Sequence, residues 1–209
     1  MNETAQAADL ANPTWKRVDE LADLTEIFDP DIQICTWARK VDPQIKEYIG
    51  QINPTETFQG IETSNASGPL SMYRLPPAPA RQALVDDLAF LRDIVHELLG
   101  CPKIGMRIAH ISHTMCPGWH IDRTGIRLVC TYKGPGTEWL NDQTADRSKL
   151  SSEEYLMMPH HQASEAEIVL LKGDFWQGNE SFGAIHRSPK VNPENGLRML
   201  VTLDSLWEE

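Results

Sequence analysis

The spacing of apolar residues changes at Gly100, and this change restricts the fold more than any other feature of the sequence. Leucine and valine recur at helical spacing over residues 84–98, and Gly100 stands where a helix commonly ends. After Gly100, short runs rich in Ile, Val, Thr and aromatic residues alternate with Gly and Pro, which is typical of strands and turns. The chain is therefore predicted to be an α+β protein whose second half is all β.

The same patterns predict one domain preceded by a short arm. Residues 1–30 are polar and predict an N-terminal arm or packing helix. Residues 31–209 are predicted to form the domain, in which 31–100 give mostly helical support and 101–209 form the β core. The polar stretch 141–165 is longer than a hairpin turn and predicts a partly ordered insertion.

Local spacing predicts the individual elements. Helical patterns cover residues 15–28 and 31–52, the second broken at Pro43, and a short strand is predicted over 70–75. The helices are expected to pack on the outside of the β core, and they also offer a surface for a homodimer. In the second half, strands are predicted over residues 104–112, 119–122, 126–132, 167–171, 184–186 and 197–203.

Charge and cysteine usage limit the partners and the compartment. The 209 residues include 19 Lys and Arg against 30 Asp and Glu, a net charge of −11, which disfavours nucleic acids and anionic membranes as partners. The start has no secretory pattern, and no stretch approaches the roughly 18 apolar residues of a membrane span. The four cysteines form no CxxC pair. These features predict a cytoplasmic protein.

A candidate metal site begins with His120 and Asp122. Two residues apart on a strand, their side chains would lie on the same face. The best third ligand is His186, at the end of a later short β run. Two imidazoles and one carboxylate match the facial triad that binds Fe(II) and leaves coordination positions open for a substrate and dioxygen. A His-x-Asp pair also occurs by chance, so the prediction of a metal site depends on the residues around these three.

An arginine follows the second histidine by twelve residues. Arg198 lies on the predicted strand 197–203, where its guanidinium could hold a carboxylate near the metal. Arg127 and Arg187 are rivals for this role, although Arg187 adjoins His186 and should point away from the metal on a strand.

This ordered motif set resembles the Fe(II)- and 2-oxoglutarate-dependent dioxygenases, most closely their prolyl-hydroxylase-like branch. The resemblance implies a double-stranded β-helix, a jelly-roll or cupin-like core, with His120, Asp122 and His186 as iron ligands and Arg198 as the anchor of 2-oxoglutarate. It also implies a cosubstrate contact from Tyr132, with Arg127 as a further candidate. The spacing between Arg127 and Tyr132 is shorter than in that branch, so the role of Tyr132 is the weaker expectation. The oxidised substrate stays unidentified.

A second resemblance covers about residues 84–204. The blocks CPGWHID (116–122), RLVCTYKGPGTEWL (127–140), LLKG (170–173) and HRSP (186–189) are similar to the bacterial domain-of-unknown-function 1826 family. That resemblance implies no activity, only a loose association with bacterial responses to zinc scarcity. Function therefore depends on the chemistry of the site.

Two non-catalytic alternatives use the same residues. Cys116, His120 and His186 together would suit Zn(II), because thiolate and imidazole ligands form tetrahedral zinc sites. That set predicts a cupin-like metal-binding or metal-sensing module without oxygenation. In the other alternative, the histidines and the aspartate are satisfied polar groups of a β-barrel interaction domain.

The remaining histidines and the tryptophans have weaker claims on the site. His110 with His113, and His160 with His161, are more often surface or structural residues than metal ligands. The tryptophans near the motifs could wall a substrate pocket, although core packing is their commoner role. These are Trp119, Trp139 and Trp176.

Overall fold

A computed structural model describes residues 14–53, 56–65, 68–71, 74–191 and 196–207. Its strands are β1 (Trp15–Val18), β2 (Ile34–Trp37), β3 (Phe58–Asn65), β4 (Lys103–Ile111), β5 (Ile126–Lys133), β6 (Glu138–Trp139), β7 (His161–Gln162), β8 (Ile168–Lys172), β9 (His186–Arg187) and β10 (Arg198–Leu206). Its helices are α1 (Pro43–Gln51), α2 (Arg81–Leu99) and α3 (Glu153–Leu156), with 3-10 helices η2 (Leu21–Phe28), η3 (Asp142–Thr144) and η4 (Arg147–Lys149).

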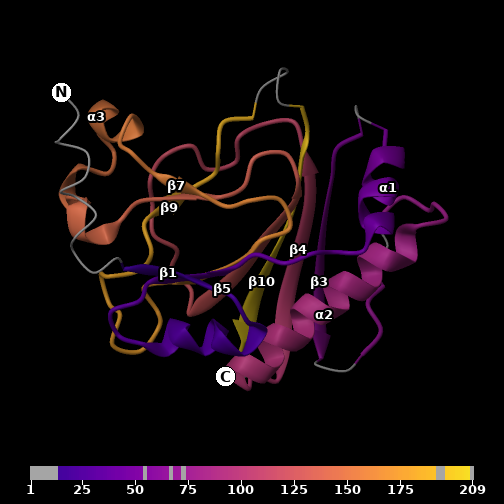
Figure 1. Cartoon of the computed structure of the whole chain (residues 1–209), viewed down its shortest axis with the longest axis horizontal. Coiled ribbons are helices and arrows are strands. Elements are labelled where there is room, and N and C mark those ends of the chain that lie inside the picture. Colours follow the sequence, from indigo (N-terminus) through magenta and orange to yellow (C-terminus); the bar gives the residue numbers. More distant parts are fainter. Residues whose placement is uncertain (1–13, 54–55, 66–67, 72–73, 192–195, 208–209) are drawn as a thin grey trace.

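The strands form two separately hydrogen-bonded sheets. The large sheet has the order β1-β2-β8-β5-β10-β4-β3, and the small sheet has the order β7-β6-β9. In the large sheet only β1 and β2 pair in parallel, among the residues described. Helix α2 crosses the face of the large sheet away from β7, β9 and α3 (Figure 1). The large sheet is therefore covered by helices on one face and by the small sheet on the other.

Alternation along the strands divides the core between these two faces. On β10, Met199 and Val201 belong to the apolar cluster shared with the helices, whereas Leu200 belongs to the cluster shared with the small sheet. On β5, Leu128 packs toward the helices and Val129 toward the small sheet. Because successive side chains of a strand point to opposite faces, every second residue is directed into the layer between the sheets.

Helix α2 follows the predicted pattern. Its residues Leu84, Leu88 and Leu91 are fully buried, and they recur at the three- and four-residue intervals that place them on one helix face. The helix ends at Gly100, whose φ of 64° is left-handed and whose N–H donates to the carbonyl of His96 at 2.7 Å. The prediction of this helix and of its end is confirmed.

The predicted helices before Pro43 are the main errors of the sequence interpretation. Residues 15–18 and 34–37 are strands, and η2 is the helical part of that segment. Strand β2 pairs with β1 on one side and with β8 on the other. The gain from these long-range strand pairs outweighs a weak local helical pattern. Of the predicted arm, residues 1–13 lie outside the described residues.

Most strands of the second half lie close to their predicted positions. Strands β4, β5, β8 and β10 occupy four of the predicted runs. The run 119–122 instead makes an isolated bridge, between His120 and His186, beside the small sheet. The stretch 141–165 contains the short helices η3, η4 and α3 together with β7. The strand predicted over 70–75 is not formed at its described residues, and 72–73 lie outside them.

Candidate metal and anion site

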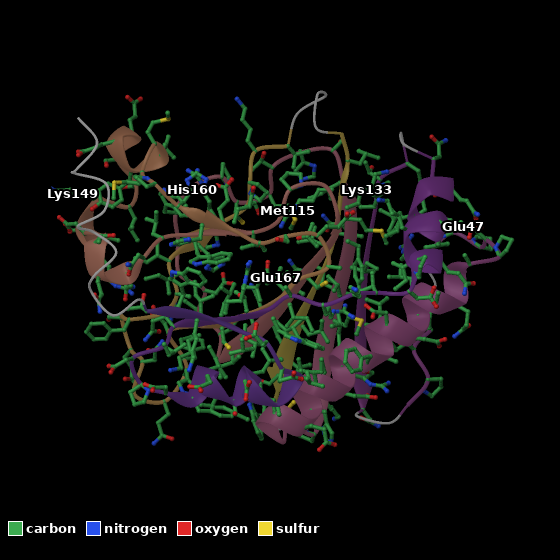
Figure 2. The ribbon with its side chains drawn as sticks, in the orientation of Figure 1. Glu47, Met115, Lys133, Lys149, His160 and Glu167 are labelled. Atoms are coloured by element: carbon green, nitrogen blue, oxygen red, sulfur yellow. The ribbon has the colours of Figure 1, made fainter. Side chains whose placement is uncertain are left out.

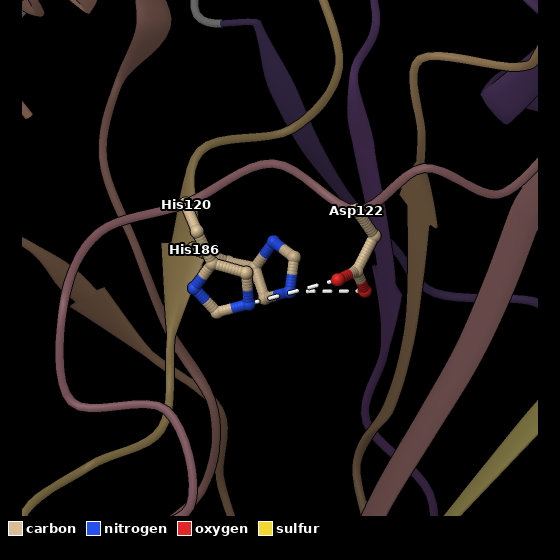
Figure 3. Close-up of side chains that lie close together, drawn as sticks. All are labelled: His120, Asp122 and His186. Carbon is tan, nitrogen blue, oxygen red and sulfur yellow. Dashed lines mark ion pairs between the residues drawn. The ribbon is translucent and has the colours of Figure 1, made fainter.

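The predicted ligands converge between the two sheets. His120 and His186 bridge each other through two backbone hydrogen bonds of 3.0 Å, which places their rings 4.4 Å apart. The Oδ atoms of Asp122 lie 3.6 Å from Nε2 of His120 and 3.3 Å from Nε2 of His186, as the dashed lines of Figure 3 show. Two donors about 2 Å from one ion at right angles would be spaced about 3 Å apart. One ligand atom from each of the three residues lies within 4.8 Å of the other two, so the group is compact enough to surround one metal ion.

Backbone hydrogen bonds fix both imidazoles for metal binding. Nδ1 of His120 lies 2.9 Å from the carbonyl oxygen of Gly118, and Nδ1 of His186 lies 3.0 Å from that of Ala184. Because a carbonyl only accepts, each Nδ1 must carry the proton, and each Nε2 keeps its lone pair for the carboxylate side. Burial and the neighbouring His186 lower the pKa of His120, which also favours the neutral form.

Asp122 is held as a carboxylate by His186 and Arg127. Burial opposes ionisation of Asp122, but a hydrogen bond from His186, when its ring is protonated at Nε2, and the guanidinium of Arg127 outweigh it and hold the pKa well below its ordinary range. Arg127 donates to Asp122 at 2.5 Å and binds both oxygens of Asp204 at 2.7 and 2.9 Å. The bidentate pair with Asp204 fixes the direction from which Arg127 reaches Asp122.

Two glycines let the backbone close around the Asp122 segment. A Cβ at Gly173 would lie 2.3 Å from the carbonyl oxygen of Thr124 and 2.7 Å from that of Asp122. A Cβ at Gly183 would lie 2.4 Å from a methyl carbon of Ile121. Only residues without a side chain fit at this approach, so the loop that carries Asp122 is packed directly against backbone.

Arg198 lies beside this group as a buried guanidinium without a carboxylate partner. It is 1% exposed, and no carboxylate of the described residues is within ion-pair distance of it. Its contacts are neutral: Nε donates to the Pro135 carbonyl at 2.9 Å, and the terminal nitrogens reach hydroxyls of Thr131 and Thr137 at 3.2 Å and of Ser188 at 3.4 Å. Burial lowers the pKa of Arg198 to about 10, so it stays charged at neutral pH.

One cavity contains both the triad and this arginine. Its volume is about 100 Å³, and His120, Asp122, His186 and Arg198 all line it. Other lining residues come from β4, β5 and β10 of the large sheet and from β9 of the small sheet. Met115, in the loop after β4, also lines it and is labelled in Figure 2. A potential metal site and a buried cation thus share one small space.

Tyr132 does not reach this cavity, contrary to the expectation. It has the same parity on β5 as Leu128, so its side chain points toward the helices. There it donates a hydrogen bond to Asp87 on α2, which is also bound by Arg39. Strand alternation separates Tyr132 from Arg127, five residues earlier on the same strand, and only Arg127 can face the site.

The three tryptophans are also placed elsewhere than predicted. None of them lines the cavity of the triad. Trp119 donates to the carbonyl of Tyr155, and its ring lies 4.0 Å from the guanidinium of Arg187. Trp139 is buried between the sheets, and Trp176 stacks on Phe28 at the surface of η2. Each ring is in contact with neighbouring side chains, and Trp176 lines a different cavity, beside Phe175 and Asp204.

The other proposed metal ligands stay outside the group. Cys116 is exposed and lines the cavity, but among the described residues the metal-competent group consists of His120, Asp122 and His186. His160, labelled near β7 in Figure 2, lies 3.6 Å from Glu138. His110 is buried on β4, with Nδ1 2.6 Å from the carbonyl of Glu56. This placement gives the thiolate zinc set no support.

The sequence also identifies the family of this protein. Residues 18–204 match the family described as "Protein of unknown function (DUF1826)". The chain belongs to this family. The match begins at the last residue of β1 and ends within β10, and it covers every strand between them, α2 and all three residues of the triad. No curated protein matches the sequence.

Solved structures of two plant dioxygenases and of a fungal protein have the same fold as the DUF1826 chain. With dioxygenase for auxin oxidation 1 from Arabidopsis thaliana, in complex with 2-oxoglutarate, it has 9% identity over 93% of this chain and 92% of that one, with a TM-score of 0.55. With the rice dioxygenase for auxin oxidation, it has 13% identity over 89% of this chain and 77% of that one, with a TM-score of 0.53. With a full-length protein from Neurospora crassa, in complex with alpha-KG and 5-formyluracil, it has 9% identity over 88% of this chain and 77% of that one, with a TM-score of 0.53.

At such identities, the likeness establishes the fold alone. The prediction of an α+β protein with a core like a double-stranded β-helix is confirmed. The finer assignment to the prolyl-hydroxylase-like branch stays a prediction. No helix in the described part of the chain is long and apolar enough to cross a membrane.

Sequence reasoning missed several polar residues around Arg198 and Asp122. Thr131, Thr137 and Ser188 supply the hydroxyl contacts of Arg198, and Asp204 anchors Arg127. Thr131 could have been found from strand alternation, because it shares the parity of Arg127 on β5. Thr137 and Ser188 lie on irregular backbone, where no periodic signal exists.

Proposed function

We propose that this DUF1826 protein is an Fe(II)/2-oxoglutarate-dependent oxygenase. One observation carries the proposal: a buried arginine without a carboxylate partner among the described residues shares a small cavity with two histidines and an aspartate. A buried unpaired charge is costly to keep, so its retention beside a potential metal site favours an anionic ligand at this point.

The donor set fits Fe(II). His120, Asp122 and His186 would hold the ion through two imidazole nitrogens and one carboxylate, which is the facial arrangement of non-haem iron oxygenases. When bound, iron and 2-oxoglutarate supply the activation of dioxygen for the oxidation of a substrate. The carbonyls of Gly118 and Ala184 keep the two imidazoles in the metal-binding tautomer.

Arg198 would bind the distal carboxylate of 2-oxoglutarate. Its planar guanidinium can form two parallel hydrogen bonds to a carboxylate, and the hydroxyls of Thr137 and Ser188 lie beside it. Arg127 has a different task, because both its nitrogen edges are engaged by Asp204 and Asp122. It is a positioning residue that orients the carboxylate of Asp122.

The structural neighbours support this proposal at the level of the fold. The Arabidopsis dioxygenase was solved with 2-oxoglutarate, and the Neurospora protein with alpha-KG together with 5-formyluracil. Fold alone does not transfer an activity, so the weight lies on the residues of this chain. A non-catalytic zinc module would give Arg198 no ligand and would use Cys116, which lies outside the ligand group.

Anaerobic metal and cosubstrate binding tests the proposal. Fe(II) and 2-oxoglutarate added to the purified protein are expected to give the weak visible charge-transfer band of a chelated complex. His186→Ala should abolish the band, and His160→Ala is the matched control that should keep it. Arg198→Gln should retain Fe(II) but weaken 2-oxoglutarate binding at least about thirtyfold, because a buried charged hydrogen-bond partner is lost. Tight zinc binding without any band in the wild type would contradict the proposal.

A further inference from the structure

Among the described residues, four arginines line the cavity of the triad, and they differ in how their charges are compensated. Arg127 and Arg187 are paired with carboxylates of the protein, and Arg198 is the proposed cosubstrate anchor. Arg107, on β4, is exposed and makes no hydrogen bond or ion pair with the residues that the structure describes. The mouth of the cavity therefore carries one cation that neither the described fold nor the proposed cosubstrate uses.

The position of Arg107 places it at the opening and not in the core. It is opposite Thr202 of β10 in register, and both residues line the cavity. On its other side it is opposite Ile61 of β3. Residues opposite each other on neighbouring strands emerge on the same face, so Ile61 and Arg107 lie side by side on the site face of the sheet. Ile61 is 65% exposed, which leaves an apolar side chain uncovered next to a cation.

The size of the cavity separates the places of two reactants. Pockets that enclose a drug-sized ligand measure roughly 300–1,000 Å³, and this cavity measures about 100 Å³. The proposed cosubstrate would occupy the part around Arg198. A second reactant would then extend outward past Arg107, an exposed residue of the lining, and over the exposed side chains of β3.

We propose that the substrate to be oxidised carries an anionic group, a carboxylate or a phosphate, which Arg107 binds while Ile61 packs against an adjoining apolar part. This inference rests on the proposed function, because it assigns the second reactant of the same site. The net charge of the chain is −11, so a positive mouth is a local exception that attracts anions to this point of the surface. A guanidinium fits both anions because its fork of N–H donors matches their paired oxygens.

The test uses the protein loaded with Zn(II) and saturating N-oxalylglycine, which replace the metal and the cosubstrate without turnover. Hexanoate, hexyl phosphate and hexan-1-ol are the three probes, and their dissociation constants are measured by NMR titration. One or both anions should bind the loaded protein with one-to-one stoichiometry, and hexan-1-ol should not. Arg107→Gln should weaken that binding at least about tenfold and leave N-oxalylglycine affinity unchanged, because one charge-assisted contact is removed. Ile61→Ser should weaken it a few-fold, and Lys46→Gln, on the remote helix α1, should have no effect.

Binding of hexanoate alone, or of hexyl phosphate alone, supports the proposal and identifies the source of the anion. Failure of both anions to bind, equal binding to Arg107→Gln, or equal binding of hexan-1-ol overturns the anion anchor while the proposed function stands. Failure of N-oxalylglycine to bind the metal-loaded wild type overturns the proposed function and this inference with it.

Discussion

Replacing Arg198 by methionine separates a role in ligand binding from a role in folding. The guanidinium is 1% exposed, and its hydrogen-bond partners are neutral groups such as the Pro135 carbonyl and the Thr137 hydroxyl. Methionine fills a similar volume without the charge. We expect the metal-free, ligand-free Arg198→Met protein to be at least as stable as the wild type, although it loses 2-oxoglutarate binding.

The magnitude follows from the desolvation of Arg198. Burial lowers its pKa from the ordinary value of 12.5 to about 10. Each unit of pKa shift corresponds to about 1.4 kcal/mol, so burying the charge costs roughly 3 kcal/mol. The four hydrogen bonds return part of this cost, and the cavity lets the vacated hydroxyls bond to water. The expected net change is between zero and about +3 kcal/mol in the free energy of unfolding.

Arg39 offers the matched comparison. It is also a buried guanidinium, but it donates to both oxygens of Asp87 at 2.5 and 2.7 Å. Arg39→Met leaves the Asp87 carboxylate buried without its cation, and it should lower the free energy of unfolding by about 3–5 kcal/mol. One arginine is thus predicted to stabilise the fold and the other to be kept at a cost to it.

Urea unfolding followed by circular dichroism, in the presence of a chelator, measures both variants. With metal added, 2-oxoglutarate at about 100 times its dissociation constant should stabilise the wild type by about 2.7 kcal/mol and leave Arg198→Met unchanged. A loss of more than about 2 kcal/mol in ligand-free Arg198→Met would refute the reasoning, because it exceeds what neutral hydrogen bonds return beyond the desolvation cost. Arg198 would then be a structural residue that its hydroxyl partners fully compensate.

Three further predictions concern the site and its support. Burial lowers the pKa of His110 below its ordinary value of 6.5, so the unfolded chain binds the extra proton first as the pH falls. The wild type should therefore lose stability below about pH 6.5. The His110→Asn variant should lose less stability over the same pH range in the same urea titrations. Gly173→Ala should cost about 1–3 kcal/mol of stability and weaken metal binding through displacement of Asp122, whereas Gly118→Ala, with open space around its Cβ, should do neither when both are compared by calorimetry. Cys116→Ser should leave the affinity for Fe(II) and Zn(II) unchanged in competition with a chromogenic chelator, and a large loss would restore the thiolate zinc site.

Local patterns were sufficient for the elements with strong periodicity. The apolar repeat of α2 and the β-rich runs of β4, β5 and β10 depend on neighbours in sequence, so they were predicted close to their bounds. Strands β1 and β2 were missed because their stability comes from pairing across the chain, β2 with β8 more than 130 residues later.

The site shows the same division. The residue types of His120, Asp122 and His186, with their spacing, were enough to nominate the triad, because metal chemistry accepts few donor groups. The expectation that Tyr132 contacts the cosubstrate was wrong because its position in the alternation of β5 turns its side chain toward the helices. Once the strand is known, this orientation can be worked out from the sequence. The expectation that the three tryptophans wall the substrate pocket was wrong for another reason. Whether an aromatic ring lines a cavity or fills the core depends on the residues that pack against it in the tertiary structure.

The sequence by itself determined the α+β class, the run of strands after Gly100 and the three candidate ligands, because these follow from periodicity and side-chain chemistry. Only the tertiary structure decided how the arginines differ. Arg127 and Arg187 are compensated by carboxylates, Arg198 is buried among neutral groups, and Arg107 is exposed at the mouth. A guanidinium has the same charge at every position, and the partners that the fold brings to it determine whether that charge supports the structure or is available to a ligand.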